Sequence, residues 1–466
     1  MCQTEFLICY NLPMQKSKIH FYGGAGYVTG ANFVLELEDK KIMLDCGLIQ
    51  GGHFASDLNR RDFEYDPGEI DYLFISHAHM DHIGRVPKLV KDGFNGKIFS
   101  THATLSLAPY MFEDALKIMR SEAQKEGKEP FYDMEDVQKA LSLWQGLDYY
   151  ETMQIDDLSV ELKNAGHILG SAMIFLDRGG RRFVYTGDLG NAPEPLLPDA
   201  DKIENANYMI IESVYGDRLH EERSQRVEIL KRVLLEAQRK GKTVLIPTFS
   251  LERTQILLLE MNNLIESGQV LPIKVFLDSP LASKVTDVFR QYTHLFRKEV
   301  QEQIARGDDI FSFPDFVEVK NPRESLKILK EKGAKVILAG SGMSTGGRVL
   351  LHEKALLEDK NTIILFVGYQ GVGTIGRKIQ EGNKRIFIDD KWVHVRAKKE
   401  SISGFSAHAD RDMLLKAIEN TADTLDELYI ALGETRSSLF LAQRAHDYLD
   451  APVHVPQNEE VREIDF

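Results

Sequence analysis

The sequence predicts an α/β and α+β protein of more than one domain, and three observations support this prediction. The chain has 466 residues, which is enough for two or three domains. Its first part is rich in predicted strands, whereas strands and helix-length segments alternate from about residue 207. Such alternation is typical of a parallel sheet covered by helices. A last stretch, 396–456, alternates strand and helix again.

The strand-rich first part contains two predicted hairpins. One spans 32–46 and turns at Glu38–Lys40, and the other spans 171–186 and turns at Gly179–Gly180. The other elements expected here are strands at 18–23 and 72–77 and helices at 104–126 and 134–145.

The second part contains short apolar runs separated by helix-length segments, as expected of buried parallel strands. These runs are 208–211, 243–247, 273–277, 335–339 and 362–367. The last stretch predicts strands at 427–432 and 452–455 around a helix at 438–449.

Composition limits the class of protein. Apolar residues make up 43% and charged residues 27%, which is typical of a globular protein. No run of 18 apolar residues and no signal-peptide pattern occurs, so we expect no membrane span and a cytoplasmic location. The three cysteines, Cys2, Cys9 and Cys46, are too few for a disulfide framework. The net charge of −14 argues against nucleic-acid binding over the whole surface but leaves a local basic groove open.

The strongest chemical signal is the segment His77-Ala-His-Met-Asp-His82, which directly follows an apolar strand. Three imidazoles and one carboxylate within six residues are ligand types that zinc prefers. Surface histidines in a polar loop are the alternative interpretation, but such density has no packing purpose. The sequence therefore predicts metal binding by His77, His79, Asp81 and His82.

Further ligands have to come from other segments. His167 lies between glycines in Asn-Ala-Gly-His-Ile-Leu-Gly, where the backbone can come close to a site. Asp188 follows an apolar strand in Thr-Gly-Asp-Leu-Gly, and Asp45 follows another. Alone, His167 reads as a loop histidine and Asp188 as a turn residue. Asp45 is a candidate for orienting a metal ligand through a hydrogen bond.

The order of these segments resembles the metallo-β-lactamase superfamily. Two later segments, Glu212-Ser-Val-Tyr-Gly-Asp-Arg218 and Gly404-Phe-Ser-Ala-His-Ala-Asp410, are similar to signatures of its β-CASP nuclease branch. That branch includes the endonuclease subunit of the cleavage and polyadenylation machinery and its bacterial and archaeal relatives. Asp278-Ser-Pro-Leu-Ala282 and Ser341-Gly-Met-Ser-Thr-Gly-Gly-Arg348 are similar to the same branch, so the likeness covers about 18–456.

The resemblance implies an αβ/βα four-layer sandwich with an inserted β-CASP α/β domain and an active site in the cleft between them. The parts expected are an N-terminal segment (1–17), the first part of the sandwich (18–207), the β-CASP domain (208–395), the C-terminal part of the sandwich (396–456) and a tail (457–466).

The resemblance also implies two Zn²⁺ ions and the residues that bind them. His77, His79 and His167 would bind the first ion, Asp81 and His82 the second, and Asp188 would bridge the two. Two such metals can share a bridging hydroxide and stabilise the attacking and leaving oxygens of a phosphodiester.

Four residues are expected to be catalytic on the same basis. His408 would protonate the leaving oxygen as general acid, and Glu212 would hold His408 in position. Asp81 and Asp188 would act through the metals they bind.

One position departs from the pattern of the RNA-cleaving members. They carry a further histidine in a Val-His-Gly-Glu-like segment, where this chain has Ile430-Ala-Leu-Gly-Glu434. Leu432 cannot bind zinc, so we expect the second metal to bind more weakly than the first. The DNA-cleaving members have an apolar residue there, which keeps DNA open as a substrate. A competing interpretation is that Leu432 packs in the core.

The glycine-rich segment starting at Ser341 lacks the Gly-Lys-Ser/Thr ending of a P-loop, so it does not predict a nucleoside triphosphatase. Its glycines and Arg348 can still cradle a phosphate of a nucleic acid. The expected substrate-binding residues are Ser279, Ser341, Gly342 and Arg348. Between 377 and 399, eight basic and three acidic residues give a local charge of +5, which fits either a solvated face or a nucleic-acid track.

These observations predict a zinc-dependent ribonuclease that hydrolyses phosphodiester bonds. RNA is the expected partner, DNA and a homodimer are left open, and no membrane is involved. The alternatives are a β-CASP DNA nuclease, a non-catalytic RNA-processing subunit with a weakened second metal site, and a hydrolase of small esters or thioesters. The inserted domain argues against the last, and the complete HAHMDH cluster argues against the non-catalytic subunit.

Overall fold

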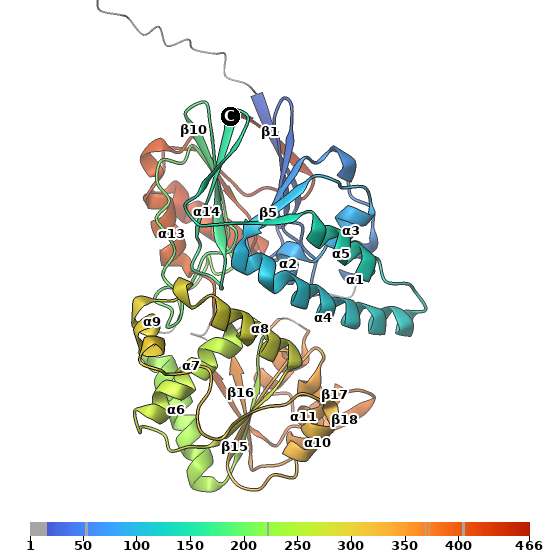
Figure 1. Cartoon of the computed structure of the whole chain (residues 1–466), viewed down its shortest axis with the longest axis vertical. Coiled ribbons are helices and arrows are strands. Elements are labelled where there is room, and N and C mark those ends of the chain that lie inside the picture. Colours follow the sequence, from blue (N-terminus) through green and yellow to red (C-terminus); the bar gives the residue numbers. More distant parts are fainter. Residues whose placement is uncertain (1–15, 52–54, 221–222, 369, 372, 403–405) are drawn as a thin grey trace, which may run out of the picture.

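The computed structural model describes residues 16–51, 55–220, 223–368, 370–371, 373–402 and 406–466. Two α/β bodies follow one another along the long axis (Figure 1). The first domain contains two seven-stranded sheets, and the inserted domain contains one six-stranded sheet. Among the described residues, no helix is both long and apolar enough to cross a membrane.

The two sheets of the first domain mix parallel and antiparallel strand pairs. The first sheet has the order β22 (Glu460–Asp465), β1 (Lys16–Gly23), β2 (Asn32–Glu36), β3 (Lys41–Leu44), β4 (Tyr72–Phe74), β5 (Lys97–Thr101) and β6 (Trp144–Leu147). The second has the order β21 (Val453–His454), β20 (Glu427–Ile430), β11 (Tyr208–Ile211), β10 (Arg181–Tyr185), β9 (Ala172–Arg178), β8 (Leu158–Asn164) and β7 (Thr152–Ile155).

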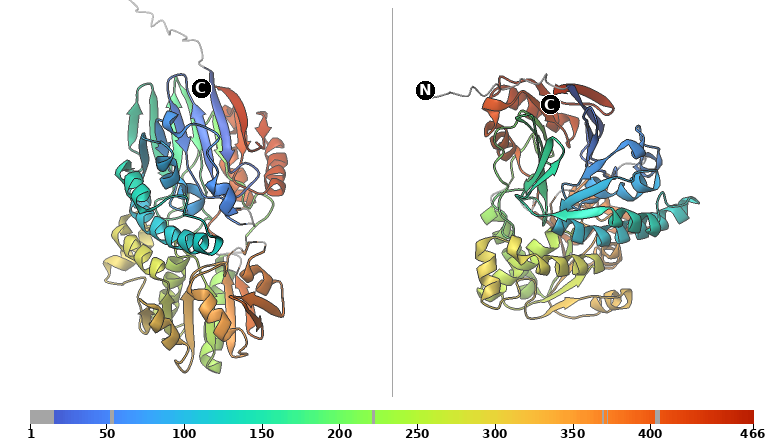
Figure 2. Two further views of the ribbon diagram at one scale, coloured as in Figure 1. Left: turned by 90° about the vertical axis from the view of Figure 1, so that its right-hand side faces the viewer. Right: turned by 45° about the horizontal axis from the view of Figure 1, so that its top comes forward.

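Alternating side chains from both sheets meet in one apolar core between them. Phe33 of the first sheet contacts Tyr185 of the second at 5.4 Å between ring centroids, and Phe21 contacts Tyr429 at the same distance. Helices cover the two outer faces (Figure 2), which gives the expected four layers. The helices are α1 (Ala55–Arg60), α2 (Met80–Ile83), α3 (Val86–Lys91), α4 (His102–Glu126) and α5 (Met134–Ser142) on one side and α13 (Arg411–Glu419) and α14 (Thr435–His446) on the other.

The inserted domain is built on a sheet whose strand pairs are all parallel. The strand order is β14 (Phe316–Glu318), β13 (Lys274–Asp278), β15 (Lys335–Ala339), β12 (Thr243–Pro247), β16 (Thr362–Val367) and β19 (Lys398–Ile402). A separate hairpin is formed by β17 (Arg385–Ile388) and β18 (Lys391–His394).

Helices cover both faces of this parallel sheet, as its continuous apolar strands require. One face packs against α6 (Arg223–Lys240), α7 (Arg253–Glu266) and α8 (Pro280–Gln291). The other packs against α10 (Pro322–Ile328) and α11 (Arg348–Leu356). The remaining helices are α9 (Lys298–Ala305) and α12 (Ile375–Gln380), and short 3₁₀ turns lie at Pro67–Glu69, Thr293–Leu295 and Ala422–Thr424.

The chain leaves the first domain after β11 and is back in it by α13, which precedes β20. The strands β11 and β20 pair in parallel from Tyr208↔Glu427 to Ile211↔Ile430. The inserted domain is therefore an excursion between neighbouring strands of one sheet, as the sequence predicts.

Three of the differences from the sequence-based prediction concern the ends of segments. The expected tail contains β22, which pairs with β1 and forms an edge of the first sheet. Its mostly charged and partly exposed residues suit an edge strand. The expected boundary at 395 precedes β19, which pairs with β16 of the inserted domain. The helix expected at 134–145 ends at Ser142, because Trp144 starts β6.

Candidate metal centre

The histidine-rich segment leaves the first sheet at the C-terminal edge of β4. The strand ends at Phe74, yet Ile75 still donates its N–H to Phe99 and Ser76 accepts the N–H of Ala172 from the second sheet. The loop therefore joins both sheets before α2 begins at Met80. His77 and His79 lie in this loop, and His82 lies in α2.

His167 and Asp188 reach the same place from two loops of the second sheet, after β8 and after β10. These loops are in backbone contact, because Gly190 donates its N–H to Ala165 at 2.8 Å. A Cβ on Gly190 would lie 1.8 Å from the carbonyl oxygen of Gly166, so only glycine fits at this position. The glycines that flank both residues in the sequence thus allow the approach that forms the site.

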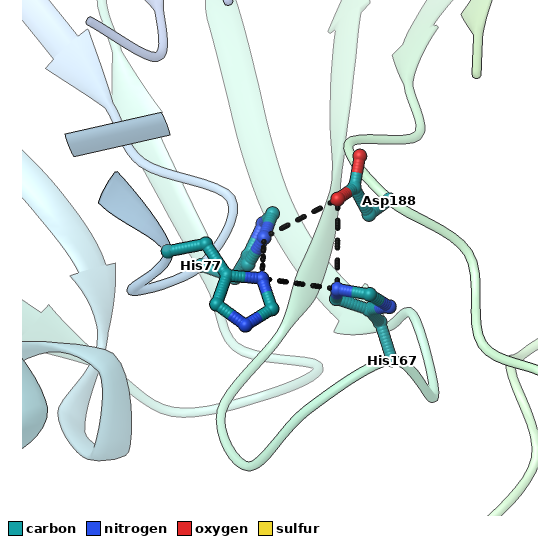
Figure 3. Close-up of side chains that lie close together, drawn as sticks. His77, His167 and Asp188 are labelled. Atoms are coloured by element: carbon teal, nitrogen blue, oxygen red, sulfur yellow. Dashed lines mark hydrogen bonds and ion pairs between the residues drawn. The ribbon is translucent and has the colours of Figure 1, made fainter. Parts of the chain in front are cut away.

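Four side chains converge in the centre of the site (Figure 3). One ligand atom from each of His77, His79, His167 and Asp188 lies within 4.8 Å of all the others. The Nδ1 of His79 is 3.0 Å from the Nε2 of His77 and 3.2 Å from that of His167. Both Nε2 atoms are 3.5 Å from Oδ2 of Asp188.

The other oxygen of Asp188 points to a different partner. Oδ1 is 3.4 Å from Nε2 of His82, a buried nitrogen that has no hydrogen-bond partner among the described residues. The carboxylate of Asp188 therefore lies between His77 and His167 on one side and His82 on the other. This is the arrangement that the sequence-based prediction requires of a bridging ligand.

Hydrogen bonds on the opposite ring nitrogens fix the orientation of three imidazoles. Nδ1 of His167 donates to the carbonyl of Ala407 at 3.1 Å, and Nδ1 of His77 lies 3.0 Å from Oγ of Ser76. Nδ1 of His82 donates to Oδ2 of Asp45 at 2.7 Å. Asp45 therefore occupies the orienting position that its place after a strand suggests.

The pKa values of the three central histidines suit metal binding. Burial lowers the pKa of His77, His79 and His167, to about 3 for His79, so these rings are in the neutral form that binds metals. Burial acts against charge on His82 too, but Asp188 and Asp45 hold its pKa well above the ordinary value.

Asp81 lies in the first turn of α2, next to this cluster. Burial, supported by the nearby charge of Asp188, raises the pKa of its carboxyl group. The four-residue group of closely spaced ligand atoms does not include Asp81. Its role as a ligand of the second metal therefore stays a prediction.

Glu212 and His408 form a second group with Asp188. The backbone of 407–409 runs beside 189–191, which brings His408 to the site. Nδ1 of His408 lies 3.4 Å from Glu212 and 3.7 Å from Asp188. Burial opposes the charged ring, but Glu212 and Asp188 outweigh it and raise the pKa of His408 to about 9. Its side chain is 24% exposed, whereas the other histidines of the site, apart from the half-buried His79, are almost fully enclosed.

The expected substrate-binding residues lie at the C-terminal edge of the inserted sheet, where ligands bind in open α/β sheets. Oγ of Ser279 is 3.1 Å from Ser250 and accepts the N–H of Ala282, which caps α8. Ser341 accepts the N–H of Thr345, and Gly342 packs on the ring of Phe249. Their contact with substrate stays a prediction.

Arg348 is committed to internal contacts. One guanidinium nitrogen donates to Oδ1 of Asp278 at 2.5 Å and to the carbonyl of Val319, and the other donates to the carbonyl of Lys320. These bonds tie α11 to β13, and they are available without a phosphate. Sequence reasoning missed this pairing because the two residues are 70 positions apart.

Leu432 is fully buried in the core between the two sheets of the first domain. Its N–H donates to the carbonyl of Gly24 at 2.6 Å. A Cβ on Gly24 would lie 2.6 Å from Cδ2 of Leu432, so a glycine makes room for the leucine. The geometry supports the interpretation in which Leu432 packs in the core. The affinity of the second metal site stays a prediction.

Two residues near the site have no sequence signal that could have identified them. Ser76 contacts both Asp45 and His77. Glu252 of the inserted domain accepts the N–H of Leu169, two residues after His167. Glu252 has a left-handed backbone, with φ of 64°, and burial raises its pKa to about 8. It links the loop of a predicted metal ligand to the inserted domain.

The residues present fit a bound metal. Three neutral imidazole nitrogens and a carboxylate oxygen face one centre, and the unpartnered Nε2 of His82 faces the other oxygen of the same carboxylate. The nitrogen atoms of these rings lie 3.0–3.2 Å apart, a spacing that suits ligand atoms around one cation. Fold and site together define a metal-dependent hydrolase built on a four-layer sandwich.

Comparison with known families agrees with this class along most of the chain. Residues 34–215 match the model of the metallo-beta-lactamase superfamily domain, and residues 254–379 match the Beta-Casp domain. Residues 392–456 match the Zn-dependent metallo-hydrolase RNA specificity domain.

Curated relatives match over nearly the whole chain. Ribonuclease TTHA0252 of Thermus thermophilus is 37% identical over 420 residues, which cover 89% of this chain and 94% of the relative. An RNase J-like protein of Methanocaldococcus jannaschii is 32% identical, and the match covers 94% of this chain and 97% of the relative. Transcription termination factor FttA of the same organism is 31% identical, and the match covers 95% of this chain and 70% of the relative. The chain belongs to the β-CASP family of the metallo-β-lactamase superfamily, as its motifs predict.

A solved structure shares the fold alone. The crystal structure of a protein of unknown function from Enterococcus faecalis V583 aligns with a TM-score of 0.57 and 15% identity, and the alignment covers 96% of this chain and all of the other.

Proposed function

We propose that this protein is a two-zinc ribonuclease that hydrolyses phosphodiester bonds of RNA. The observation that carries the proposal is the position of Asp188, whose two carboxylate oxygens face different histidines 3.4–3.5 Å away. A carboxylate shared in this way suits two metals about 3.5–4 Å apart, the spacing of two-metal phosphodiester hydrolases.

The proposed ligand sets follow from these contacts. His77, His79, His167 and Asp188 would hold the first zinc. Asp81, His82 and Asp188 would hold the second, with fewer protein ligands because Leu432 stands at the family's histidine position. When bound, the zinc ions supply a water of lowered pKa and positive charge beside the phosphodiester oxygens.

His408 is the proposed proton donor to the leaving oxygen. A pKa of about 9 keeps its ring protonated at neutral pH. Nδ1 faces the two carboxylates, so Nε2 is the atom free to deliver the proton. Glu212 positions this ring while accepting the N–H of Leu189 at 2.6 Å. The histidine is thereby tied to the residue that follows Asp188 in the chain.

RNA is the proposed substrate because relatives that cover nearly the whole chain are named ribonucleases, and residues 392–456 match an RNA specificity domain. One observation favours DNA as the second candidate, namely the apolar side chain at Leu432. A cytoplasmic location and a homodimer also stay predictions, and sedimentation of the purified chain tests the dimer.

Metal analysis combined with cleavage of end-labelled RNA and DNA of one sequence tests the proposal. Asp81→Ala should lose most hydrolysis and retain at most one zinc per chain, with an unchanged circular dichroism spectrum. Asp62→Ala, which removes an exposed carboxylate of the first domain, is the matched control and should behave as the parent. Full activity of metal-stripped protein or of Asp81→Ala would overturn the metal mechanism, and cleavage of DNA alone would replace RNA by DNA.

A separate variant distinguishes a proton donor from a metal ligand at His408. His408→Ala should retain the zinc content of the parent and lose kcat on RNA. The loss should be smaller for a substrate whose leaving group needs no proton, such as a nitrophenyl phosphodiester. Loss of zinc together with activity would show instead that His408 is a ligand, as its grouping with Glu212 and Asp188 also allows.

A further inference from the structure

The β17–β18 hairpin carries two exposed aromatic side chains on its outer face. Phe387 and Trp392 are directly opposite each other in the antiparallel register, and their ring centroids are 5.4 Å apart. Phe387 is 51% exposed and Trp392 is 55% exposed. Figure 1 places this hairpin at the side of the inserted domain.

The hairpin is firmly anchored, so the exposure of the aromatic pair is not a sign of loose packing. Its inner face contributes Ile386, Ile388 and Val393 to a buried cluster with Ile364 and Ile379 of the inserted domain. Each of the three inner side chains is at most 2% exposed. The core is therefore complete without Phe387 and Trp392.

The surroundings of the aromatic pair are basic. The guanidinium of Arg385 lies 5.2 Å from the ring centroid of Trp392, and Lys384, Lys391 and Arg396 are exposed nearby in the chain. Residues 384–399 contain six Lys or Arg and two Asp, which leaves four positive charges in a chain of net charge −14.

Two of the acidic groups next to the hairpin are already engaged. Asp389 pairs with Lys354 at 3.1 Å, and Glu358 accepts the N–H of His394. Asp390 of the turn has no ion pair among the described residues, and Lys398 is paired with Glu236 and Glu400. In the described part of the chain, no ion pair neutralises Lys384, Arg385, Lys391 or Arg396. The excess positive charge thus faces solvent together with the two rings.

We propose that this hairpin, defined by Arg385, Phe387 and Trp392, binds unstacked bases of a single-stranded nucleic acid outside the metal centre. Exposed aromatic rings stack with bases of any sequence, and the arginine and lysines attract the phosphates. The net positive charge around the hairpin favours a nucleic acid over an apolar protein as the binding partner. That the strand is RNA rests on the proposed function, whereas the stacking itself does not.

The chain offers a direct probe, because it contains only two tryptophans and the other, Trp144, is buried at the inner end of a strand. Titration of the full chain with a single-stranded RNA should quench the fluorescence of Trp392, and duplex RNA should quench it far less. Trp392→Phe should remove the signal and keep the affinity. Single-stranded DNA as the titrant separates the two sources of unstacked bases.

Phe387→Ser with Trp392→Ser should weaken binding of a long single-stranded RNA roughly tenfold or more. KM for that RNA should rise with kcat unchanged, while kinetics on a short oligonucleotide that fills only the metal centre stay the same. Tyr448→Ser, which removes an aromatic ring of 53% exposure from the first domain, is the matched control.

The proposal is overturned if the double variant binds long RNA as the parent does, or if RNA binds without quenching Trp392. A change of sedimentation instead of RNA affinity would also overturn it, because the hairpin would then be a contact between protein chains. Quenching in a protein that cleaves no RNA would leave this inference standing and refute the proposed ribonuclease function.

Discussion

Polar side chains gather at the C-terminal ends of strands in both the first domain and the inserted domain. The contacts that these side chains make differ between the two domains. At the edge of the first domain, His77, His167 and Asp188 face a common centre, and the contacts between them are those of ligand atoms. At the edge of the inserted domain, Asp278 is surrounded by Arg348, His352 and Ser325, which satisfy both of its oxygens.

The difference shows what marks a functional site. Side chains that satisfy one another, such as Asp278 with Arg348 and His352, stabilise the fold. Side chains such as His77, His167 and Asp188, whose ligand-type atoms face one centre, are arranged to hold something outside the chain. Variants of the two aspartates should therefore differ in their effect on bound zinc.

Asp188→Asn should have the largest effect on activity. Loss of one charged oxygen weakens both proposed metal sites, so hydrolysis should fall by far more than the 10–100-fold that is typical when a residue merely orients a ligand. Zinc content should fall as well. Burial opposes the charge of Asp188, but His82, His408 and His77 outweigh it and hold its pKa well below the ordinary value, so Asp188→Asn should also lower the free energy of unfolding of the metal-free protein. Zinc analysis, RNA cleavage and urea unfolding of metal-free protein check these points.

Retention of zinc and activity in Asp188→Asn would contradict the bridging role. A matched substitution at Asp199, an exposed aspartate in the loop that follows the site, controls for general effects of charge loss.

Asp278→Ala should lower the stability of the protein without changing its zinc content. It leaves Arg348 and His352 without their buried partner, which costs about 3–5 kcal/mol of stability in comparable pairs. Zinc content should not change, because the metal centre lies in the other domain. Denaturant unfolding and zinc analysis of the same sample measure both effects. Loss of zinc without loss of stability would mean that the two edges are not independent.

Glu353 should make the inserted edge sensitive to pH. Its Oε1 accepts a hydrogen bond from Ser344 of the glycine-rich loop, and burial raises its pKa to about 7 from an ordinary value of 4.5. Between these two values the folded chain holds a proton that the unfolded chain has lost. The contribution of Glu353 to the free energy of unfolding is therefore complete below about pH 4.5 and is lost as the pH rises to about 7.

Glu353→Gln cannot titrate, so its unfolding free energy should fall less than that of the parent over this range, by up to roughly 3 kcal/mol. Denaturant unfolding at several pH values checks the difference, with the exposed Glu299→Gln as control. Parallel pH profiles for parent and Glu353→Gln would show that this carboxyl group stays ionised in the folded protein.

The sequence predicts the metal edge far better than the inserted edge, and chain distance explains why. His77, His79 and His82 are neighbours in the chain, so their clustering is visible in the sequence. His167 and Asp188 became candidates because of their family motifs, since each alone reads as an ordinary loop residue. The pairing of Arg348 with Asp278 depends on the parallel order of the inserted strands, which residue spacing does not reveal.

The same limit applies to packing. The leucine at 432 is visible as a departure from the family pattern, but the glycine at 24 that admits it lies at the other end of the chain. The edge strand β22 was likewise missed, because its partner β1 is more than 400 residues away. Local composition predicts secondary structure and clusters of metal-ligand residues. Contacts between distant segments determine which polar side chains are left to bind a ligand.

The smallest expected effect concerns Asp45. A variant of this residue distinguishes a side chain that orients a metal ligand from one that binds the metal itself. Its Oδ2 accepts hydrogen bonds from His82, Ser76 and Tyr185 at 2.6–2.7 Å. Asp45→Asn keeps the shape but weakens the acceptor for His82, so affinity for the second zinc should fall about 10–100-fold while the first zinc stays bound. Competition with a chelator measures both affinities, and the exposed Asp426→Asn is the control. Equal loss of both metals would show that Asp45 supports the whole loop instead of one ligand.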